Sequence, residues 1–197
     1  MVAIWKNTSG NILKAASGAI LACDECPCDL ECTHPCDIVP PLTCRVSMFF
    51  RNRTTNEVCS ATMTSSDITL TRDGTPSAGL CSFSGNGTIG LLVAYVTVWI
   101  TQECVVTPTG YYTLYYSIRF VYPDCIDTPD TQIFQTPPLE DNSFLVLHPD
   151  PIADTDAFSG SWPGDQTAYC AWEFIDLIGC SDGFAFPIVD GTFELWE

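Results

Sequence analysis

The sequence predicts a mainly β protein, an antiparallel β-sandwich or jelly-roll-like domain with a short cysteine-rich segment at its amino end. Apolar and polar residues alternate with a period of two in several segments, and no segment shows a convincing long helical period. Of the 197 residues, 46% are hydrophobic, which is ample for a core. We place the cysteine-rich segment at residues 1–41 and the β domain at residues 42–197.

The first strands are predicted by alternation alone. In LTCRVSMFF, residues 42–50, every second side chain is apolar, and the pattern ends at Arg51. Residues 66–74, SDITLTRDG, repeat it and end in a turn. Further along, Asn86-Gly87 has the composition of a hairpin turn, so we expect the chain to reverse there.

The best-defined unit is a hairpin made from residues 91–106 and 111–123. Even-numbered residues are apolar in both strands, so both even faces must meet the same core. Directly opposed residues must then have numbers with an even sum, which requires a loop of odd length. A loop over residues 106–110 meets this condition and places Val98 opposite Ile118.

The odd-numbered face of this hairpin is a candidate contact surface. It carries Tyr95, Trp99, Tyr115 and Arg119 among hydroxyl side chains. Aromatic rings with polar neighbours stack on sugars or pack against another subunit. The alternative is that a second sheet or a crossing loop covers this face.

Four later segments complete the predicted strands, for about nine in all. They are SFLVLH at 143–148, AYCAWEFIDLIGC at 168–180, FAFPIV at 184–189 and GTFELWE at 191–197. The AWEFIDLI stretch has the period of a short helix, but its flanks and aromatic content favour a strand.

Five of the twelve cysteines fall within fourteen positions: Cys23, Cys26, Cys28, Cys32 and Cys36. Zinc is one interpretation, with Cys23, Cys26, Cys32 and Cys36 as ligands or His34 replacing one of them. The two short pairs are, however, closer together than the halves of a usual zinc site.

Disulfides are the second interpretation. The number of cysteines is even, and several are dispersed through the β domain as loop-closing bridges would be. A dithiol catalyst is a third, but the two acids between Cys23 and Cys26 oppose formation of a thiolate.

The charge balance excludes some partners. Twenty-four acidic residues face seven basic ones, for a net charge of −17, so we expect no nucleic-acid binding. The longest apolar run, residues 91–100, is far short of the roughly 20 residues of a membrane span. Lys6 and Asn7 interrupt the region where a signal peptide would be apolar, although the cysteine content favours an oxidising location.

The motifs of catalysis are weak. His34 and His148 are the two histidines, no G-x-S-x-G elbow occurs, and the acidic loops lack the calcium-loop spacing. We therefore expect no enzymatic activity. A hydrolase with an acidic site is the least favoured interpretation, since the separation of a carboxylate pair is spatial.

The amino-terminal stretch AIWKNTSGNILKAASGAILACDECPC, residues 3–28, resembles small cysteine-rich structural proteins of bacteriophages. The resemblance covers about the first 40 residues and implies a virion protein, a head decoration or tail-associated subunit, which lysis would release without a signal peptide. A virion role implies other virion subunits as partners. The edge strands of such a domain favour a homo-oligomer, and the aromatic face of the hairpin would contact a partner subunit or a host glycan. The alternative is a secreted carbohydrate-binding or adhesion module.

Overall fold

The structure is a computed structural model that describes residues 3–4, 22–23, 41–73, 80–101, 113–126, 130–137, 139–141, 155–161, 168–183 and 185–196. The chain divides into two compact units, Met1–Cys32 and Thr33–Glu197. In the first unit, β1 (Ala3–Ile4) and β2 (Ala22–Cys23) form an antiparallel pair.

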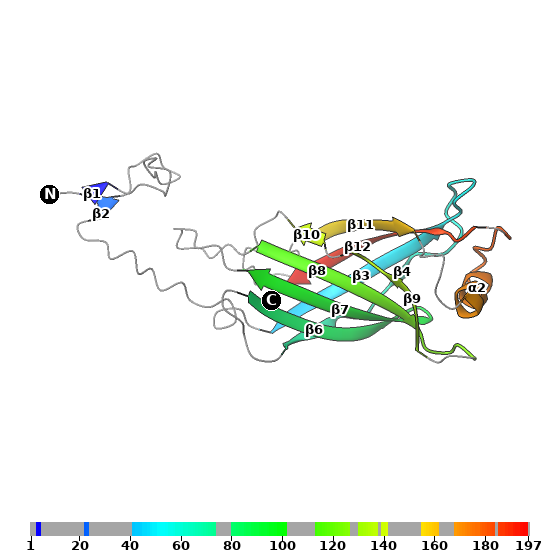
Figure 1. The fold of residues 1–197 in the computed structure, drawn as a ribbon, viewed down its shortest axis with the longest axis horizontal. Coiled ribbons are helices and arrows are strands. Elements are labelled where there is room, and N and C mark those ends of the chain that lie inside the picture. Colours follow the sequence, from blue (N-terminus) through cyan, green and yellow to red (C-terminus); the bar gives the residue numbers. More distant parts are fainter. Residues whose placement is uncertain are drawn as a thin grey trace. The chain divides into compact units, whose positions relative to one another are not determined.

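The second unit is built on an antiparallel sheet of ten strands among its described residues (Figure 1). The strands are β3 (Leu42–Arg51), β4 (Met63–Thr64), β5 (Ile68–Arg72), β6 (Leu80–Ile89), β7 (Leu92–Thr101), β8 (Thr113–Tyr122), β9 (Thr131–Gln135), β10 (Leu139–Asp141), β11 (Thr155–Ser161) and β12 (Ile188–Trp196). Their order is β10-β8-β7-β6-β5-β3-β12-β11, with β4 beside β3 and β9 beside β8. The prediction of a mainly β fold is confirmed.

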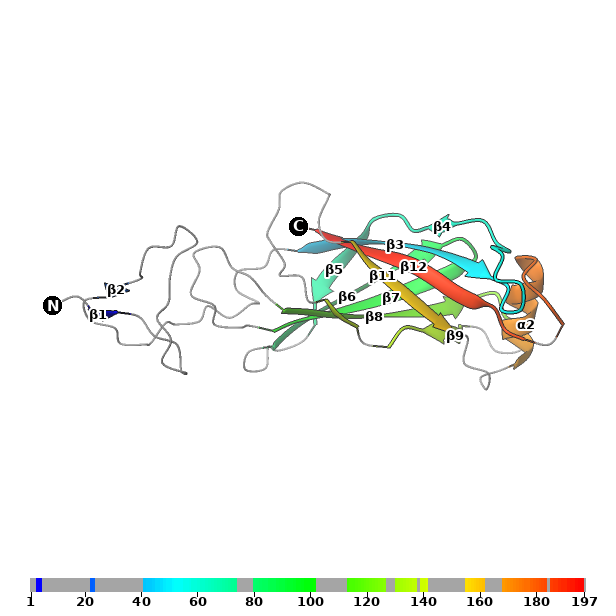
Figure 2. The same cartoon turned by 90° about the horizontal axis from the view of Figure 1, so that it is seen from above.

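The sheet is strongly curled, and β5 is the corner at which it turns. β5 pairs with β3 at Ile68–Leu70 and with β6 at Thr71 and Arg72. The half containing β3, β12 and β11 consequently faces the half containing β6, β7 and β8 (Figure 2). The Tyr116 ring of β8 stacks on the Phe193 ring of β12, with centroids 4.3 Å apart. The core therefore lies between two facing layers, as in a sandwich.

Alternation places the core side chains as predicted. In β3 every second residue from Leu42 to Phe50 is buried, and in β7 every second residue from Leu92 to Ile100 is buried. Each residue between them in these strands is half-buried on the opposite face, except Thr101, whose side chain is not described. Burial of one face and solvation of the other is the arrangement that a period of two encodes.

The β7–β8 hairpin has the predicted faces but a different register. Opposed residues have numbers with an even sum, yet Val98 faces Tyr116 and Val96 faces Ile118. The predicted pairing of Val98 with Ile118 is therefore wrong by two residues. A shift by two leaves every side chain on its own face, so the hydrophobic pattern could not detect it. The predicted loop, 106–110, lies outside the described residues.

The turn predicted at Asn86-Gly87 is wrong. β6 runs through both residues, and the chain reverses at Gly90 and Leu91, between the opposed residues Ile89 and Leu92. Gly90 has φ of 58°, which a two-residue hairpin loop with glycine first requires.

The strand predicted at residues 168–180 is a helix, α2 (Ala168–Leu177). Its buried residues, Cys170, Ala171, Phe174 and Ile175, repeat with the helical period. Phe174 contacts Phe50 at the end of β3 and Tyr122 at the end of β8, with ring centroids 5.6 and 5.7 Å apart. Phe174, one of the aromatic residues that favour a strand, packs α2 against one end of the core (Figure 1). In the described part of the chain no helix is long and apolar enough to cross a membrane.

The two last predicted strands are one strand, β12, which begins at Ile188. Gly191 lies in its middle because a Cβ there would be 2.5 Å from the Ser47 backbone oxygen and 2.1 Å from Phe158 Cζ. This glycine marks a close approach of strands and does not interrupt β12. The strand predicted at 143–148 lies outside the described residues.

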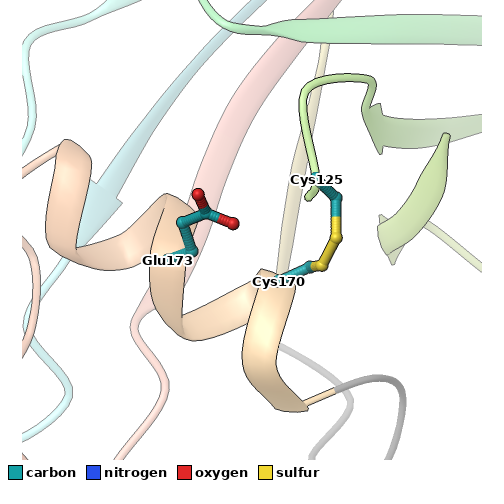
Figure 3. Close-up of side chains that lie close together, drawn as sticks. All are labelled: Cys125, Cys170 and Glu173. Atoms are coloured by element: carbon teal, nitrogen blue, oxygen red, sulfur yellow. A yellow bond between two sulfur atoms is a disulfide. The ribbon is translucent and has the colours of Figure 1, made fainter. Parts of the chain in front are cut away.

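Two disulfides fasten α2. Cys170 in its first turn is bonded to Cys125 after β8 (Figure 3). Cys180 beyond its last turn is bonded to Cys59 after β3. Cys81 is disulfide-bonded as well. The disulfide interpretation therefore applies to cysteines of the β domain.

Candidate functional site

The candidate site is the outer face of β6, β7 and β8, where the register aligns side chains in rows across the strands. The first row is Ser82, Trp99 and Tyr115; the second is Ser84, Thr97 and Ser117; the third is Asn86, Tyr95 and Arg119. The second row holds small hydroxyl side chains, whereas bulky side chains stand in the rows on both sides. Large rows around a small row produce a groove that runs across the strands.

This outer groove has a volume of about 710 Å³. Its described lining residues are Thr69, Thr71, Ser84, Gly85, Asn86, Tyr95, Val96, Thr97, Trp99, Ser117, Arg119 and Gln135. Thr71 of β5 is opposed to Ser84, so it extends the hydroxyl row to a fourth strand. The floor is therefore a line of four hydroxyl side chains, with Trp99 on one wall and Tyr95 on the other.

Arg119 is held between two neighbours on the wall formed by the third row. Its guanidinium carbon lies 4.6 Å from the ring centroid of Tyr95, which is a cation–π contact. On its other side Arg119 is opposed to Gln135 of β9. The Gln135 amide nitrogen donates to Ser117 Oγ at 3.2 Å, which orients the amide at that end of the floor.

Hydrogen bonds within the protein fix three of the four floor hydroxyls, and the first is Thr71 Oγ1, which donates to the Ser84 carbonyl oxygen at 3.4 Å. Ser117 Oγ donates to the Thr136 carbonyl oxygen at 3.1 Å, and Ser84 Oγ donates to Asp73 Oδ1 at 2.5 Å. The floor is thus rigid, and the carboxylate of Asp73 stands at the β5 end, opposite the end that holds Arg119.

Three of the four residues singled out in the sequence line the outer groove: Tyr95, Trp99 and Arg119. Tyr115 lies on the same face, opposed to Trp99, but it does not line the groove. The sequence reasoning missed the contributions of Asn86, Gln135 and Thr71, because they come from neighbouring strands whose order it could not supply. Asn86 was also assigned to a turn.

The proposed zinc ligands are only partly described. Cys23 is in β2, opposed to Ala3, whereas Cys26, Cys32 and Cys36 lie outside the described residues. The zinc interpretation of this cluster stays a prediction.

A second group of possible metal ligands joins Cys125, Cys170 and Glu173, whose ligand atoms lie within 4.8 Å of one another (Figure 3). The two sulfur atoms form a disulfide, so neither is a thiolate. Glu173 Oε2 is buried without a hydrogen bond from the described residues, and the carboxylate raises the pKa of Tyr122, after desolvation by burial. In the oxidised protein this group lacks the donors of a metal site.

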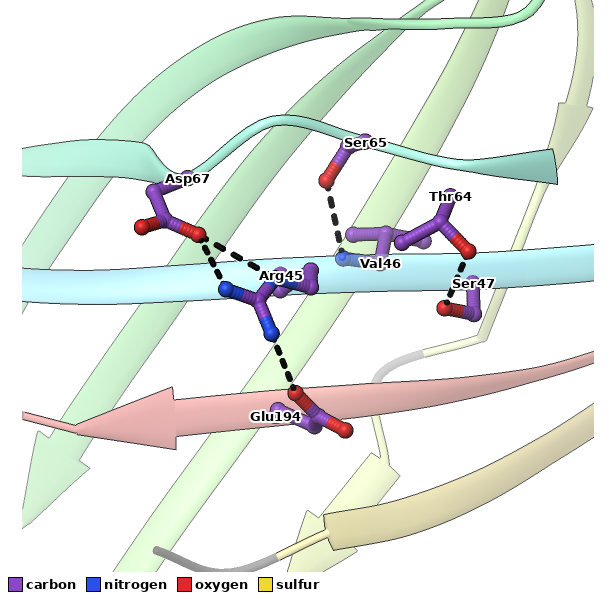
Figure 4. Close-up of polar contacts among 7 residues, drawn as sticks. All are labelled: Arg45, Val46, Ser47, Thr64, Ser65, Asp67 and Glu194. Carbon is purple, nitrogen blue, oxygen red and sulfur yellow. Dashed lines mark hydrogen bonds and ion pairs between the residues drawn. The ribbon is translucent and has the colours of Figure 1, made fainter. Parts of the chain in front are cut away.

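The opposite half of the sheet keeps its polar groups occupied with one another (Figure 4). Arg45 contacts Asp67 at 2.6 Å and Glu194 at 3.6 Å, and the Val46 amide donates to Ser65 Oγ. Arg51 pairs with Asp190. By contrast, no described carboxylate pairs with Arg119, so the outer groove offers a charged donor that the other face does not.

Comparison with known proteins places no relative beside this chain: no family model, curated protein or solved structure matches it.

Proposed function

We propose that this protein acts by surface contact and not by catalysis, and that the outer groove binds a saccharide. The observation that carries the proposal is the groove itself, in which Trp99 lines one wall beside a floor of four hydroxyl side chains. Sugars present an apolar C–H face together with many hydroxyl groups. An aromatic ring with fixed polar groups meets both requirements.

The chemistry of the lining supports binding over turnover. The described lining residues include no carboxylate, histidine or cysteine, which are the usual general acids, bases and nucleophiles, and Asp73 beside the β5 end is a single carboxylate already bonded to Ser84. Asn86 and Gln135 supply amides that both donate and accept hydrogen bonds. These groups position a ligand without providing a proton-transfer partner near neutral pH.

The test is binding of the purified protein to an array of neutral and acidic glycans, followed by titration of each hit. We expect Trp99→Ala to weaken binding at least about tenfold, as loss of a central aromatic contact does. The matched control is Tyr169→Ala, which removes an exposed aromatic ring on α2, 60% exposed and away from the groove. No binding to any glycan, or equal losses in both variants, would overturn the proposal.

We further propose that the contact is made from a virion, where the chain is a head decoration or tail-associated subunit that assembles with its own copies. Strand β11 favours assembly, because among the described strands it pairs only with β12, and edge strands are where neighbouring chains pair. Ala157 and Ser159 are exposed on β11. Sedimentation should show an oligomer that A157K/S159K dissociates, and a wild-type monomer at all concentrations contradicts self-assembly.

A further inference from the structure

We infer that the saccharide bound in the outer groove carries a carboxylate, as uronic and sialic acids do, and that Arg119 binds it. The inference rests on the proposed saccharide function and adds the charge of the ligand. It starts from the position of Arg119, an exposed cation on the groove wall in a chain of net charge −17. Among the described lining residues it is the one with a full positive charge.

The stacking of Arg119 on Tyr95 leaves its donors available. The five N–H groups of a guanidinium lie in its plane, and the guanidinium carbon of Arg119 lies over the Tyr95 ring, 4.6 Å from the ring centroid. The ring restricts the side chain and removes water from the side that it contacts. A planar fork held in this way matches the two oxygens of a carboxylate, so the binding geometry is organised before the ligand arrives.

A negative charge at one end of the groove and a positive charge at the other should orient a bound acidic saccharide. Asp73 accepts a hydrogen bond from Ser84 at the β5 end, and Arg119 stands on β8 beside β9. Three strand spacings separate β5 from β8, or about 14 Å. The carboxylate of a bound saccharide should therefore lie at the β8–β9 end, since the Asp73 end repels it.

The net charge of the chain limits which acidic ligands can bind. A net charge of −17 repels polyanions in general, so unspecific uptake of acidic polymers is disfavoured. A preference for an acidic sugar must then come from the local ion pair between Arg119 and the carboxylate of the sugar. Trp99 and the hydroxyl row hold the ring, and Arg119 holds the acid.

The experiment compares each acidic glycan that binds with its carboxyl-reduced form, in which the acid is a primary alcohol and the rest of the molecule is unchanged. The probes include sialyllactose and a hyaluronan hexasaccharide, with lactose and chitohexaose as neutral counterparts. Dissociation constants come from calorimetry. For the wild-type protein we expect reduction of the carboxyl group to weaken binding at least about tenfold, or about 1.4 kcal/mol.

Three variants locate the effect. In Arg119→Gln the acidic and reduced forms should bind equally, and Arg119→Lys should keep part of the preference because it retains the charge without the fork. The control is Arg72→Gln, an exposed arginine of β5 that does not line the groove, and it should behave as the wild type. Circular dichroism of each variant reports folding.

The outcomes separate this inference from the proposal beneath it. If the wild-type protein binds only neutral glycans, or binds acidic and reduced forms equally, the inference is wrong and the saccharide function stands. If no glycan binds, both fall. The wild-type comparison decides the matter even if the Arg119 variants do not fold.

Discussion

Cys59 and Cys180 are joined by a disulfide across 121 positions of the sequence, and the bond fastens the end of α2 to the loop after β3. The bridge between Cys125 and Cys170 fastens the start of the same helix to the segment after β8. Because β3 and β8 belong to opposite halves of the curled sheet, α2 holds both halves at one end of the core (Figure 1).

Removing the first bridge should cost stability. For the double variant C59S/C180S we expect the free energy of unfolding to fall by about 2–5 kcal/mol, because a cross-link over a long loop restricts the unfolded chain. Urea unfolding measures the loss. Cys44→Ala is the control, since it removes a buried sulfur without breaking a bridge and should cost about 1 kcal/mol. Equal losses in the two proteins would contradict a stabilising role for the bridge.

The Cys44 thiol should make the fold sensitive to alkali. Burial, with a smaller contribution from Asp67, raises its pKa from 9.0 to about 12. A raised pKa stabilises the fold fully below pH 9, and this contribution is lost as the pH rises from 9 toward 12, because the unfolded thiol ionises while the native one stays protonated. At pH 10.5 the loss from this group should be about 2 kcal/mol, at 1.36 kcal/mol per pH unit.

The measurement is urea unfolding at pH 8 and pH 10.5 for the wild type and Cys44→Ala. The wild type should lose more stability between the two pH values than the variant does. Identical losses would mean that the thiol is not shielded from ionisation in the native state.

Gly191→Ala should destabilise β12. The added Cβ would meet the Ser47 backbone oxygen at 2.5 Å, and a backbone atom in a paired strand cannot move aside. We expect a loss of about 1–3 kcal/mol, read from thermal unfolding. Thr192→Ala, a change at the next residue on the half-buried outer face, should cost less. If the two variants unfold at the same temperature, β12 does not pack as closely on β3 as described.

Filling the groove floor should abolish binding without unfolding the protein. In Thr97→Phe the ring would occupy the space between Trp99 and Tyr95, and phenylalanine is well tolerated in strands. We expect the affinity for any glycan that binds to fall more than about tenfold, with circular dichroism unchanged. Val93→Phe adds the same ring to the same strand outside the groove, and it should bind as the wild type does.

The sequence predicted what local periodicity controls. Alternation identified β3, β5, β7 and β8 and the buried face of each, because burial on one side leaves a period of two. It could not identify the register of β7 with β8, since a shift by two residues preserves both faces. It also placed a turn at Gly87 and divided β12 at Gly191, because the need for both glycines comes from neighbouring strands: an added Cβ would be 2.6 Å from Ile68 at Gly87 and 2.5 Å from the Ser47 backbone oxygen at Gly191.

The candidate site divides in the same way. Tyr95, Trp99 and Arg119 were found together because they alternate on one hairpin. The rows that turn this face into a groove depend on which strands lie beside the hairpin. β6 and β5 lie on one side of the hairpin and β9 lies beside β8 on the other. This arrangement depends on how the sheet turns at β5, and the turn leaves no local signal in the sequence.

Along β7, buried residues with even numbers alternate with Tyr95, Thr97 and Trp99, whose side chains lie on the face that bears the groove. Substitution of odd-numbered residues of β7 therefore leaves the core contacts of the even-numbered residues in place. A lineage of such proteins could exchange one recognition surface for another by replacing every second residue of three strands, while the interior stays the same and folding is undisturbed.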